Sequence, residues 1–320
     1  MSNLFDRILV AIDDSEPAKV ALAIGARLAR EHDGELVLCN VVNWLTVVAE
    51  LESTGAVVDP KSTIDAMTRH AQELLDEAAR DALHHGIIAQ RQLVEGEPAK
   101  SILGVAGKLH CSVIVMGTHA RGGLGRLFIG STTDAVLRGS SIPVLTVRPE
   151  TIIAEPSRNC FERIVVGADD SEPARAAIET IIGHAAADGC HVLFCSVVDI
   201  DTVVGARGYY DTAVHASLYD EAQRAVDGAV TEARANDVAA EGRIAEGNAS
   251  RALIAVAKRE NADLIVTGSH GRRGVRRVFV GSVAETIVRT SPVPVLVVRS
   301  AARAGAATGV RAKRQTSAAL

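Results

Sequence analysis

The sequence predicts an α/β fold of two tandem, doubly wound open sheets, each with five parallel strands in the order 3-2-1-4-5. Length, composition and an internal repeat are the basis of this prediction. A chain of 320 residues is long for one core and suggests about two domains. Hydrophobic residues make up 48% of the chain and aromatic residues only 3%. The cores are therefore aliphatic, which favours buried parallel strands covered by helices.

The repeat is visible directly in the sequence. RILVAIDDSEPAKVAL, from Arg7, returns as RIVVGADDSEPARAAI from Arg163, an offset of 163 − 7 = 156. GTHARGGLGRLFIGS, from Gly117, returns as GSHGRRGVRRVFVGS from Gly268, an offset of 268 − 117 = 151. The second copy is therefore about five residues shorter. We expect the difference in the variable stretch that begins near Trp44, because loops tolerate changes of length.

Within each copy, β-branched segments alternate with segments of helical period, which is the pattern of βαβ units and a parallel sheet. In the first copy we expect strands at 7–12, 35–42, 88–94, 112–116 and 143–147. The expected helices are 17–32, 62–85, 98–109 and 131–139. Asp14 or Ser15 is the expected N-cap of the first helix, with Pro17 in its first turn. Right-handed crossovers favour the strand order 3-2-1-4-5.

The domain boundaries follow from the repeat. We expect domain one at 1–150 and domain two at 160–300, joined by the proline-containing linker PETIIAEPSRNC. The tail at 301–320 is rich in small and polar residues and shows no apolar period, so we expect it to be disordered.

Charge and composition argue against several classes of partner. The net charge of -5 and the pI near 6.1 give no general attraction to nucleic acid or to anionic membranes. No apolar segment approaches the roughly 18 residues that cross a bilayer, and MSNLFDRILV lacks the pattern of a signal peptide. We therefore expect a soluble, cytoplasmic protein. The five cysteines lack CxxC spacing, so we expect reduced, buried thiols.

The candidate site of each copy lies where the strand order reverses, because a crevice opens there between the carboxyl ends of strands 1 and 4. In the first copy, strand 1 ends at Asp13-Asp14-Ser15, and strand 4 runs into a glycine-rich loop that ends at Gly130-Ser131. Glycines let a backbone approach a ligand closely, and the N–H groups of a helix N-terminus attract anions. The sequence therefore predicts a phosphate cradle in each copy.

The loop of the second copy carries a known pattern. Gly268-x-x-Gly271, nine further residues and Gly281-Ser282 resemble the ATP-binding signature of universal stress proteins, G-x-x-G-x9-G-[ST]. The resemblance covers 7–148 and 163–299, essentially both copies. It implies an adenine nucleotide alpha hydrolase-like fold and ATP as the ligand.

The expected nucleotide-binding residues follow from this resemblance and from the strand ends. Asp13 and Asp169 match the family's aspartate near the base, and Val41 and Val197 match a residue that contacts adenine or ribose. The expected set in the first copy is Ala11, Ile12, Asp13, Ser15, Val41, Met116, Gly117, Ala120, Arg121, Gly130, Ser131 and Thr132. In the second copy it is Ala168, Asp169, Ser171, Val197, Thr267, Gly268, Gly271, Arg272, Gly281, Ser282 and Val283.

One departure from the pattern separates the copies. Ala120 stands where the second copy has Gly271. If the backbone there needs φ > 0, alanine costs about 1 kcal/mol and its methyl group crowds a phosphate. We therefore expect the second copy to bind ATP more tightly, unless Gly122 and Gly123 reshape the loop of the first.

Several of these residues have other readings. Asp14 and Ser15 could serve only as helix caps, and the paired acids could hold Mg²⁺ beside a triphosphate. The loop arginines either contact phosphates or solvate the loop. His119 and His270 lie at equivalent loop positions, but no nucleophile is near them in sequence. We therefore assign no catalytic residue and no metal ligand.

The sequence favours a regulatory, ATP-binding stress-response module that is not an enzyme. A slow ATPase or adenylyl-transfer enzyme is the alternative, although neither loop contains a lysine. A dehydrogenase is less favoured because the first turn is DDSEP, and a nucleotide-free structural relative is a third reading. We expect the copies to pair as a pseudo-dimer through 143–147 and 294–298, which would otherwise be exposed sheet edges. A homodimer of chains is left open.

Overall fold

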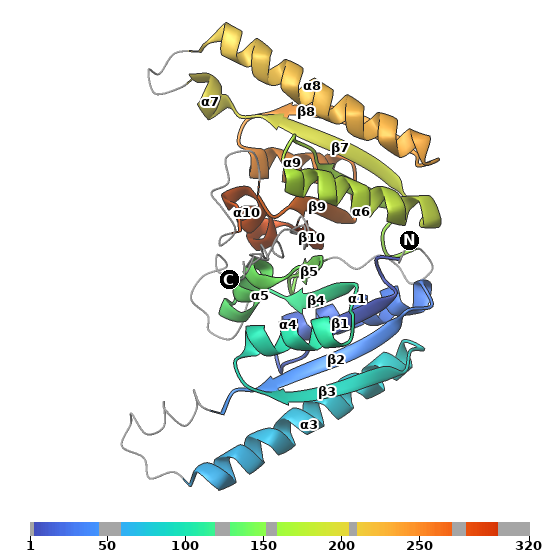
Figure 1. Cartoon of the computed structure of the whole chain (residues 1–320), viewed down its shortest axis with the longest axis vertical. Helices are drawn as coiled ribbons and strands as arrows, with labels where there is room; N and C mark the ends of the chain where they lie inside the picture. Colours follow the sequence, from blue (N-terminus) through green and yellow to red (C-terminus); the bar gives the residue numbers. More distant parts are fainter. Residues whose placement is uncertain are drawn as a thin grey trace, which may run out of the picture.

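The computed structural model describes residues 3–44, 59–118, 129–151, 159–204, 210–270 and 280–299. The molecule is elongated, and two similar halves lie end to end along its long axis (Figure 1). The expected tail and most of the expected linker lie outside the described residues, as does most of the stretch after Trp44 in which the length difference is expected.

The first half alternates strands and helices. Its elements are β1 (Arg7–Ala11), α1 (Glu16–Glu31), β2 (Glu35–Val42), α3 (Pro60–His84), β3 (Ala89–Glu95), α4 (Pro98–Lys108), β4 (Val113–Gly117), α5 (Ser131–Gly139) and β5 (Val144–Val147). The predicted boundaries of this half are confirmed to within two residues.

The second half repeats this order. Its elements are β6 (Arg163–Gly167), α6 (Glu172–Asp188), β7 (His191–Val198), α7 (Ile200–Val204), α8 (Thr212–Ala235), β8 (Ala240–Glu246), α9 (Ala249–Arg259), β9 (Leu264–Gly268), α10 (Ser282–Thr290) and β10 (Val295–Val298). The short helix α7 was not predicted. Ser15 and Ser171 are the N-caps of α1 and α6, and each side-chain oxygen accepts a hydrogen bond from a backbone N–H of the first turn.

The strands form one ten-stranded sheet in the order β3-β2-β1-β4-β5-β10-β9-β6-β7-β8. Within each half the strands are parallel, and the predicted order 3-2-1-4-5 is confirmed in both. The halves meet where β5 pairs antiparallel with β10, and Leu145 lies opposite Leu296. The expected pairing of the two fifth strands is therefore present within one chain. It lies at the middle of the molecule, between the outlying helices α3 and α8 (Figure 1).

A hydrophobic core lies on each face of the sheet. Ile8 and Val10 of β1 belong to the core that α1, α3, α6 and α8 cover, whereas Leu9 belongs to the core that α4, α5, α9 and α10 cover. Both sides of β1 are buried, which explains its unbroken apolar sequence. The first of these cores joins buried side chains of both halves, so the halves share hydrophobic packing as well as a sheet.

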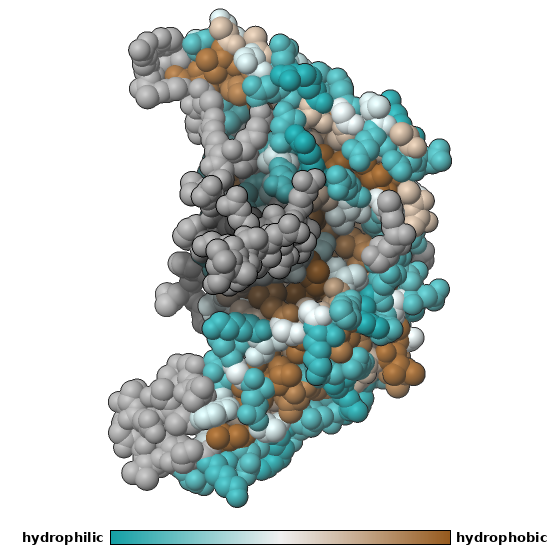
Figure 2. Space-filling view, in the orientation of Figure 1, coloured by the Kyte–Doolittle hydropathy of each residue, from teal (hydrophilic) through white to brown (hydrophobic). Residues whose placement is uncertain are grey.

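Figure 2 shows hydrophilic side chains over much of the visible surface of both halves. Hydrophilic side chains line the outward side of α3 along the lower edge of that view. No helix of the described residues combines the length and the apolar character needed to cross a membrane.

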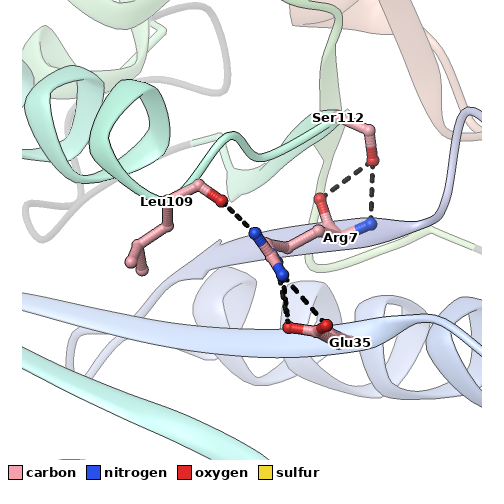
Figure 3. A network of polar contacts seen from close by, with 4 residues as sticks. All are labelled: Arg7, Glu35, Leu109 and Ser112. Carbon is pink, nitrogen blue, oxygen red and sulfur yellow. Dashed lines mark hydrogen bonds and ion pairs between the residues drawn. The ribbon is translucent and has the colours of Figure 1, made fainter. Parts of the chain in front are cut away.

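Polar contacts hold the amino ends of the strands in the first half (Figure 3). Arg7 on β1 donates to both carboxylate oxygens of Glu35 on β2, and its guanidinium also donates to the carbonyl of Leu109. The Ser112 hydroxyl accepts from the Arg7 backbone N–H at 3.0 Å and donates to the Arg7 carbonyl at 2.9 Å. These contacts fix β1 between β2 and the start of β4.

The second half uses a carboxylate at the same place. Asp263 is equivalent to Ser112, since 263 − 112 = 151, and it accepts hydrogen bonds from the backbone N–H groups of Glu162 and Arg163. Burial raises the pKa of Asp263 from its ordinary value of 3.8 to about 6, although these two backbone donors act in the opposite direction.

This raised pKa predicts a pH dependence of stability. Between about pH 4 and pH 6, Asp263 holds a proton in the folded chain that the unfolded chain has released. Its contribution to the free energy of unfolding is therefore complete below about pH 4 and is lost as the pH rises through about 6. Relative to Asp263→Asn, the wild-type chain should lose stability over this range in urea denaturation. Parallel pH profiles for the two proteins would contradict the assignment.

All five cysteines are buried and free, as expected. Burial is the main cause that raises the pKa of Cys39, Cys160 and Cys190 to about 12, and of Cys111 and Cys195 to about 11. Thiols react as thiolates, so these groups are chemically inert at neutral pH.

We therefore expect the intact protein to have the same mass with and without a reductant. A thiol reagent should react with none of the five cysteines until denaturant unfolds the chain, because access and ionisation are both lacking. Loss of two titratable thiols in the unreduced, unfolded protein would reveal a disulfide and refute this prediction.

Candidate functional site

Each half contains a cavity at the carboxyl ends of its strands, where the strand order reverses. The cavity of the second half has a volume of about 690 Å³, and that of the first half about 220 Å³. Open α/β sheets bind ligands at this topological position. The sequence-predicted location of the site therefore coincides with a hollow in both halves.

The expected site residues that the structure describes all line these two cavities. In the first half these are Ala11, Ile12, Asp13, Ser15, Val41, Met116, Gly117, Gly130, Ser131 and Thr132. In the second half they are Ala168, Asp169, Ser171, Val197, Thr267, Gly268, Gly281, Ser282 and Val283. Four expected residues lie outside the described residues, namely Ala120, Arg121, Gly271 and Arg272.

The aspartate after the first strand of each half is part of a tight turn. One carboxylate oxygen of Asp169 accepts a hydrogen bond from the backbone N–H of Ser171 at 2.9 Å. In the same way, one carboxylate oxygen of Asp13 accepts a hydrogen bond from the backbone N–H of Ser15 at 3.0 Å. The Ser15 hydroxyl also donates to Asp13. Such side-chain turns hold a carboxylate in a fixed direction. In both halves the aspartate therefore has a structural task as well as a place in the cavity wall.

The glycine at the end of the fourth strand is required by packing. A Cβ atom on Gly268 would lie 2.7 Å from the backbone nitrogen of Ala174, and one on Gly117 would lie 2.4 Å from Cβ of Pro17. Strand and helix N-terminus approach so closely that a side chain between them would displace one or the other. The sequence pattern identified these glycines as residues that approach a ligand. In the structure, the atoms closest to each glycine belong to the first helix of the same half.

The helix that begins beside each cavity has a glycine N-cap. Gly130 precedes α5 and Gly281 precedes α10, and neither makes a side-chain capping bond. Six other helices with described N-caps use Ser, Asp, Glu or Asn side chains instead. Among the described residues, no side chain caps the first turn of either helix, and the positive end of the helix dipole lies beside the cavity. An anion suits both features.

Three positions of the cavity wall carry smaller side chains in the second half than in the first. Gly167 replaces Ala11 and Ala168 replaces Ile12 at the same positions, since both pairs differ by 156. Thr267 likewise replaces Met116. These residues form the cavity wall next to the first and fourth strands, so each exchange leaves more room for a ligand in the second half.

Some wall residues were not predicted from the sequence. Leu218 and Glu221 reach the second cavity from the long helix α8, which carries no recognisable motif. In the first half the buried Asn40 donates to the carbonyl of Ile12 at 2.9 Å, so it supports the end of β1 from β2. Ser196, which lines the second cavity, occupies the equivalent position in the repeat. A polar residue at this position in both copies was the only signal in the sequence for Asn40.

His270 also lines the second cavity. Burial lowers its pKa, and the charge of Arg299 lowers it further, so both favour the neutral imidazole. Nδ1 lies 3.1 Å from the Ser269 hydroxyl, while Nε2 is buried without a hydrogen-bond partner among the described residues. A buried polar atom of this kind favours a ligand that can complete its hydrogen bonding.

Comparisons with known proteins identify the family. The universal stress protein family model matches residues 4–148 and 161–299. A universal stress protein of Mycolicibacterium smegmatis is 26% identical over 295 residues, which are 91% of this chain and 96% of that protein. Universal stress protein YxiE of Bacillus subtilis is 34% identical over 149 residues, which are 45% of this chain and 100% of that protein. The crystal structure of a universal stress protein from Archaeoglobus fulgidus has the same fold, with a TM-score of 0.68, 24% identity and coverage of 93% of this chain and 98% of its own. The chain therefore belongs to the universal stress protein family, with one family domain in each half.

Proposed function

We propose that this chain is an ATP-binding regulatory module whose principal nucleotide site is the cavity of the second half. The observation that carries the proposal is the cavity of about 690 Å³ that ends on the glycine N-cap of α10. Small-molecule sites usually enclose about 300–1,000 Å³. The second cavity falls within this range, and the first, at about 220 Å³, falls below it.

The wall of the second cavity suits the parts of ATP in order. Val197 at the end of β7 offers an apolar contact for adenine, and Asp169 offers a carboxylate to the base or ribose. The N–H groups that begin α10 suit the phosphates. If Mg²⁺ accompanies the nucleotide, the phosphates supply part of its oxygen coordination. The resemblance of the loop to the family signature points to the same ligand.

A slow ATPase is the second candidate. The neutral His270 with its buried Nε2 is the observation that favours it, because a neutral imidazole can take a proton. Steady release of inorganic phosphate from ATP would support this candidate. If the protein only binds ATP, the wild-type chain should release phosphate no faster than the His270→Gln variant.

The proposal is tested first by the nucleotide that the protein carries. Denaturing the purified protein should release ATP or ADP into the supernatant, close to one equivalent per chain. After the nucleotide has been removed, the chain should bind ATP at one tight site, as measured by calorimetry. Failure to bind ATP at millimolar concentration would rule the proposal out.

Two matched variants then assign the site. Gly281→Val places a branched side chain at the start of α10, and Gly130→Val makes the same change at the start of α5. Both backbones have negative φ values, so valine fits without strain. We expect Gly281→Val to remove the tight site and Gly130→Val to retain it. Equal affinities in the two variants would contradict the asymmetry between the halves.

A further inference from the structure

The two halves meet at a second place, away from the paired strands β5 and β10. There the C-terminal end of α1 from the first half faces the C-terminal end of α6 from the second, near the N label in Figure 1. His32 is the C-cap of α1, and Asp188 is the last residue of α6. They occupy the same position in the repeat, since 188 − 32 = 156. The symmetric pairing of the halves therefore brings two equivalent positions together.

Two histidines and a carboxylate converge at this contact. Asp188 Oδ1 lies 3.4 Å from Nδ1 of His32, and Asp188 Oδ2 lies 2.7 Å from Nδ1 of His184. The ligand atoms of the three residues all lie within 4.8 Å of one another. The side chains of His184 and His32 are only 2% and 7% exposed, and that of Asp188 is 22% exposed.

The short contact between His184 and Asp188 lacks the geometry of a hydrogen bond. Nδ1 of His184 and Oδ2 of Asp188 are both buried and have no hydrogen-bond partner among the described residues. Nε2 of His184 lies 4.0 Å from Sγ of Cys190, whose thiol donates to the carbonyl of Phe161, so a ring proton on Nε2 suits this contact. Nδ1 then carries a lone pair, as does the carboxylate oxygen. In this tautomer the two lone pairs face each other in a buried place, and a cation between or beside them satisfies both.

The surroundings favour a cation at this point. The negative ends of the dipoles of α1 and α6 both lie here. Phe5 packs against both imidazoles, with ring centroids 4.9 Å from His32 and 5.0 Å from His184, and so shields the cluster from water.

We propose that His32, His184 and Asp188 form a zinc site that joins the two halves of the chain. Zinc accepts two imidazole nitrogens and a carboxylate oxygen and takes water as a fourth ligand, for which the partly exposed side of Asp188 gives access. Magnesium and calcium prefer oxygen ligands alone. With bonds of about 2.1 Å, tetrahedral ligands lie about 3.4 Å apart. The contact of 3.4 Å between Asp188 and His32 matches this spacing, whereas the contact of 2.7 Å between Asp188 and His184 is shorter and has to lengthen when the metal binds.

The site would act as a clamp between the halves. One ligand comes from the first half and two come from the second, so bound zinc fixes the position of α1 relative to α6. Because the unfolded chain does not hold these residues together, zinc binding adds to folding stability. The cluster shares no residue with either cavity, so variants of the cluster leave the residues of both cavity walls unchanged.

The test uses the untagged full-length chain, stripped with a chelator and free of nucleotide. Titration with Zn²⁺ should show one tight site per chain, and Co²⁺ should give the visible absorption of a low-coordinate nitrogen and oxygen site. His32→Gln and Asp188→Asn should each weaken Zn²⁺ binding about tenfold or more. Zinc should raise the unfolding temperature of the wild-type chain by several degrees and that of the two variants much less.

His191→Gln is the matched control, because His191 also pairs with a carboxylate, Glu241, but lies outside the cluster. It should bind Zn²⁺ as tightly as the wild type. His32 and Asp188 are preferred to the more buried His184, so that both variants fold, which circular dichroism verifies. A wild-type chain that binds no Zn²⁺ overturns the proposal. So does undiminished binding in His32→Gln and Asp188→Asn, because the metal would then lie elsewhere.

Discussion

Leu145→Ala and Leu296→Ala should each lower the free energy of unfolding by about 2–5 kcal/mol. These leucines face each other across the antiparallel pair β5 and β10, and both are fully buried. Each truncation removes apolar contacts and leaves a cavity at the junction of the halves. Because the two side chains are direct neighbours, the double variant should lose less than the sum of the single losses.

Urea denaturation measures this effect, and Leu83→Ala is the control. Leu83 is 60% exposed on α3, so its truncation should change the free energy of unfolding by less than about 0.5 kcal/mol. If Leu145→Ala or Leu296→Ala were as mild as the control, the two halves would not depend on this junction for their stability.

Exchanging the cavity walls should exchange the nucleotide affinities of the halves. Gly167→Ala together with Ala168→Ile gives the second cavity the two residues that end the first strand of the first half, and we expect ATP binding there to weaken about tenfold or more, equivalent to about 1.4 kcal/mol. The folded chain can accept these residues. A Cβ on Gly167 would lie 3.4 Å from Leu253, an ordinary contact, and the first half already holds Ala11 and Ile12 at these positions.

The reciprocal variant, Ala11→Gly with Ile12→Ala, should enlarge the first cavity and strengthen its ATP binding. Calorimetry on the Gly281→Val background isolates this site. Gly183→Ala serves as a control for the second half, because a Cβ at that helical position meets nothing within 4 Å. If wall exchange left both affinities unchanged, the loops 119–128 and 271–279 would decide the asymmetry instead.

The fold was predictable because its signals are local and occur twice. Each first helix begins with the same Ser, Glu and Pro sequence, and the first and fourth strands of each half are apolar segments bounded by polar residues. The two cavities were also predictable, because strand order alone determines where the crevice opens. Even the residues that set their unequal volumes, such as Ile12 and Ala168, were among the expected site residues.

What the sequence could not provide is the effect of packing. The expected difference in ATP affinity rests on Ala120, which lies outside the described residues and stays a prediction, whereas the unequal cavity volumes appear only when side chains are placed together. The need for glycine at Gly117 and Gly268 comes from the approach of a helix, which no loop motif records. The contact of His32 with Asp188 depends on how two halves pair, and residues 156 positions apart give no local signal of it.

The antiparallel pair of β5 and β10 also determines what the chain does on dilution. When two such domains are separate molecules, joining their edge strands is a second-order event that weakens as concentration falls. Here both strands belong to one polypeptide, so each domain experiences the other at an effective concentration on the order of millimolar or higher, whatever the amount of protein in solution. The two unlike cavities therefore always occur in a ratio of one to one. A domain can pair with a domain of another chain only if the strand pair of β5 and β10 within its own chain separates first.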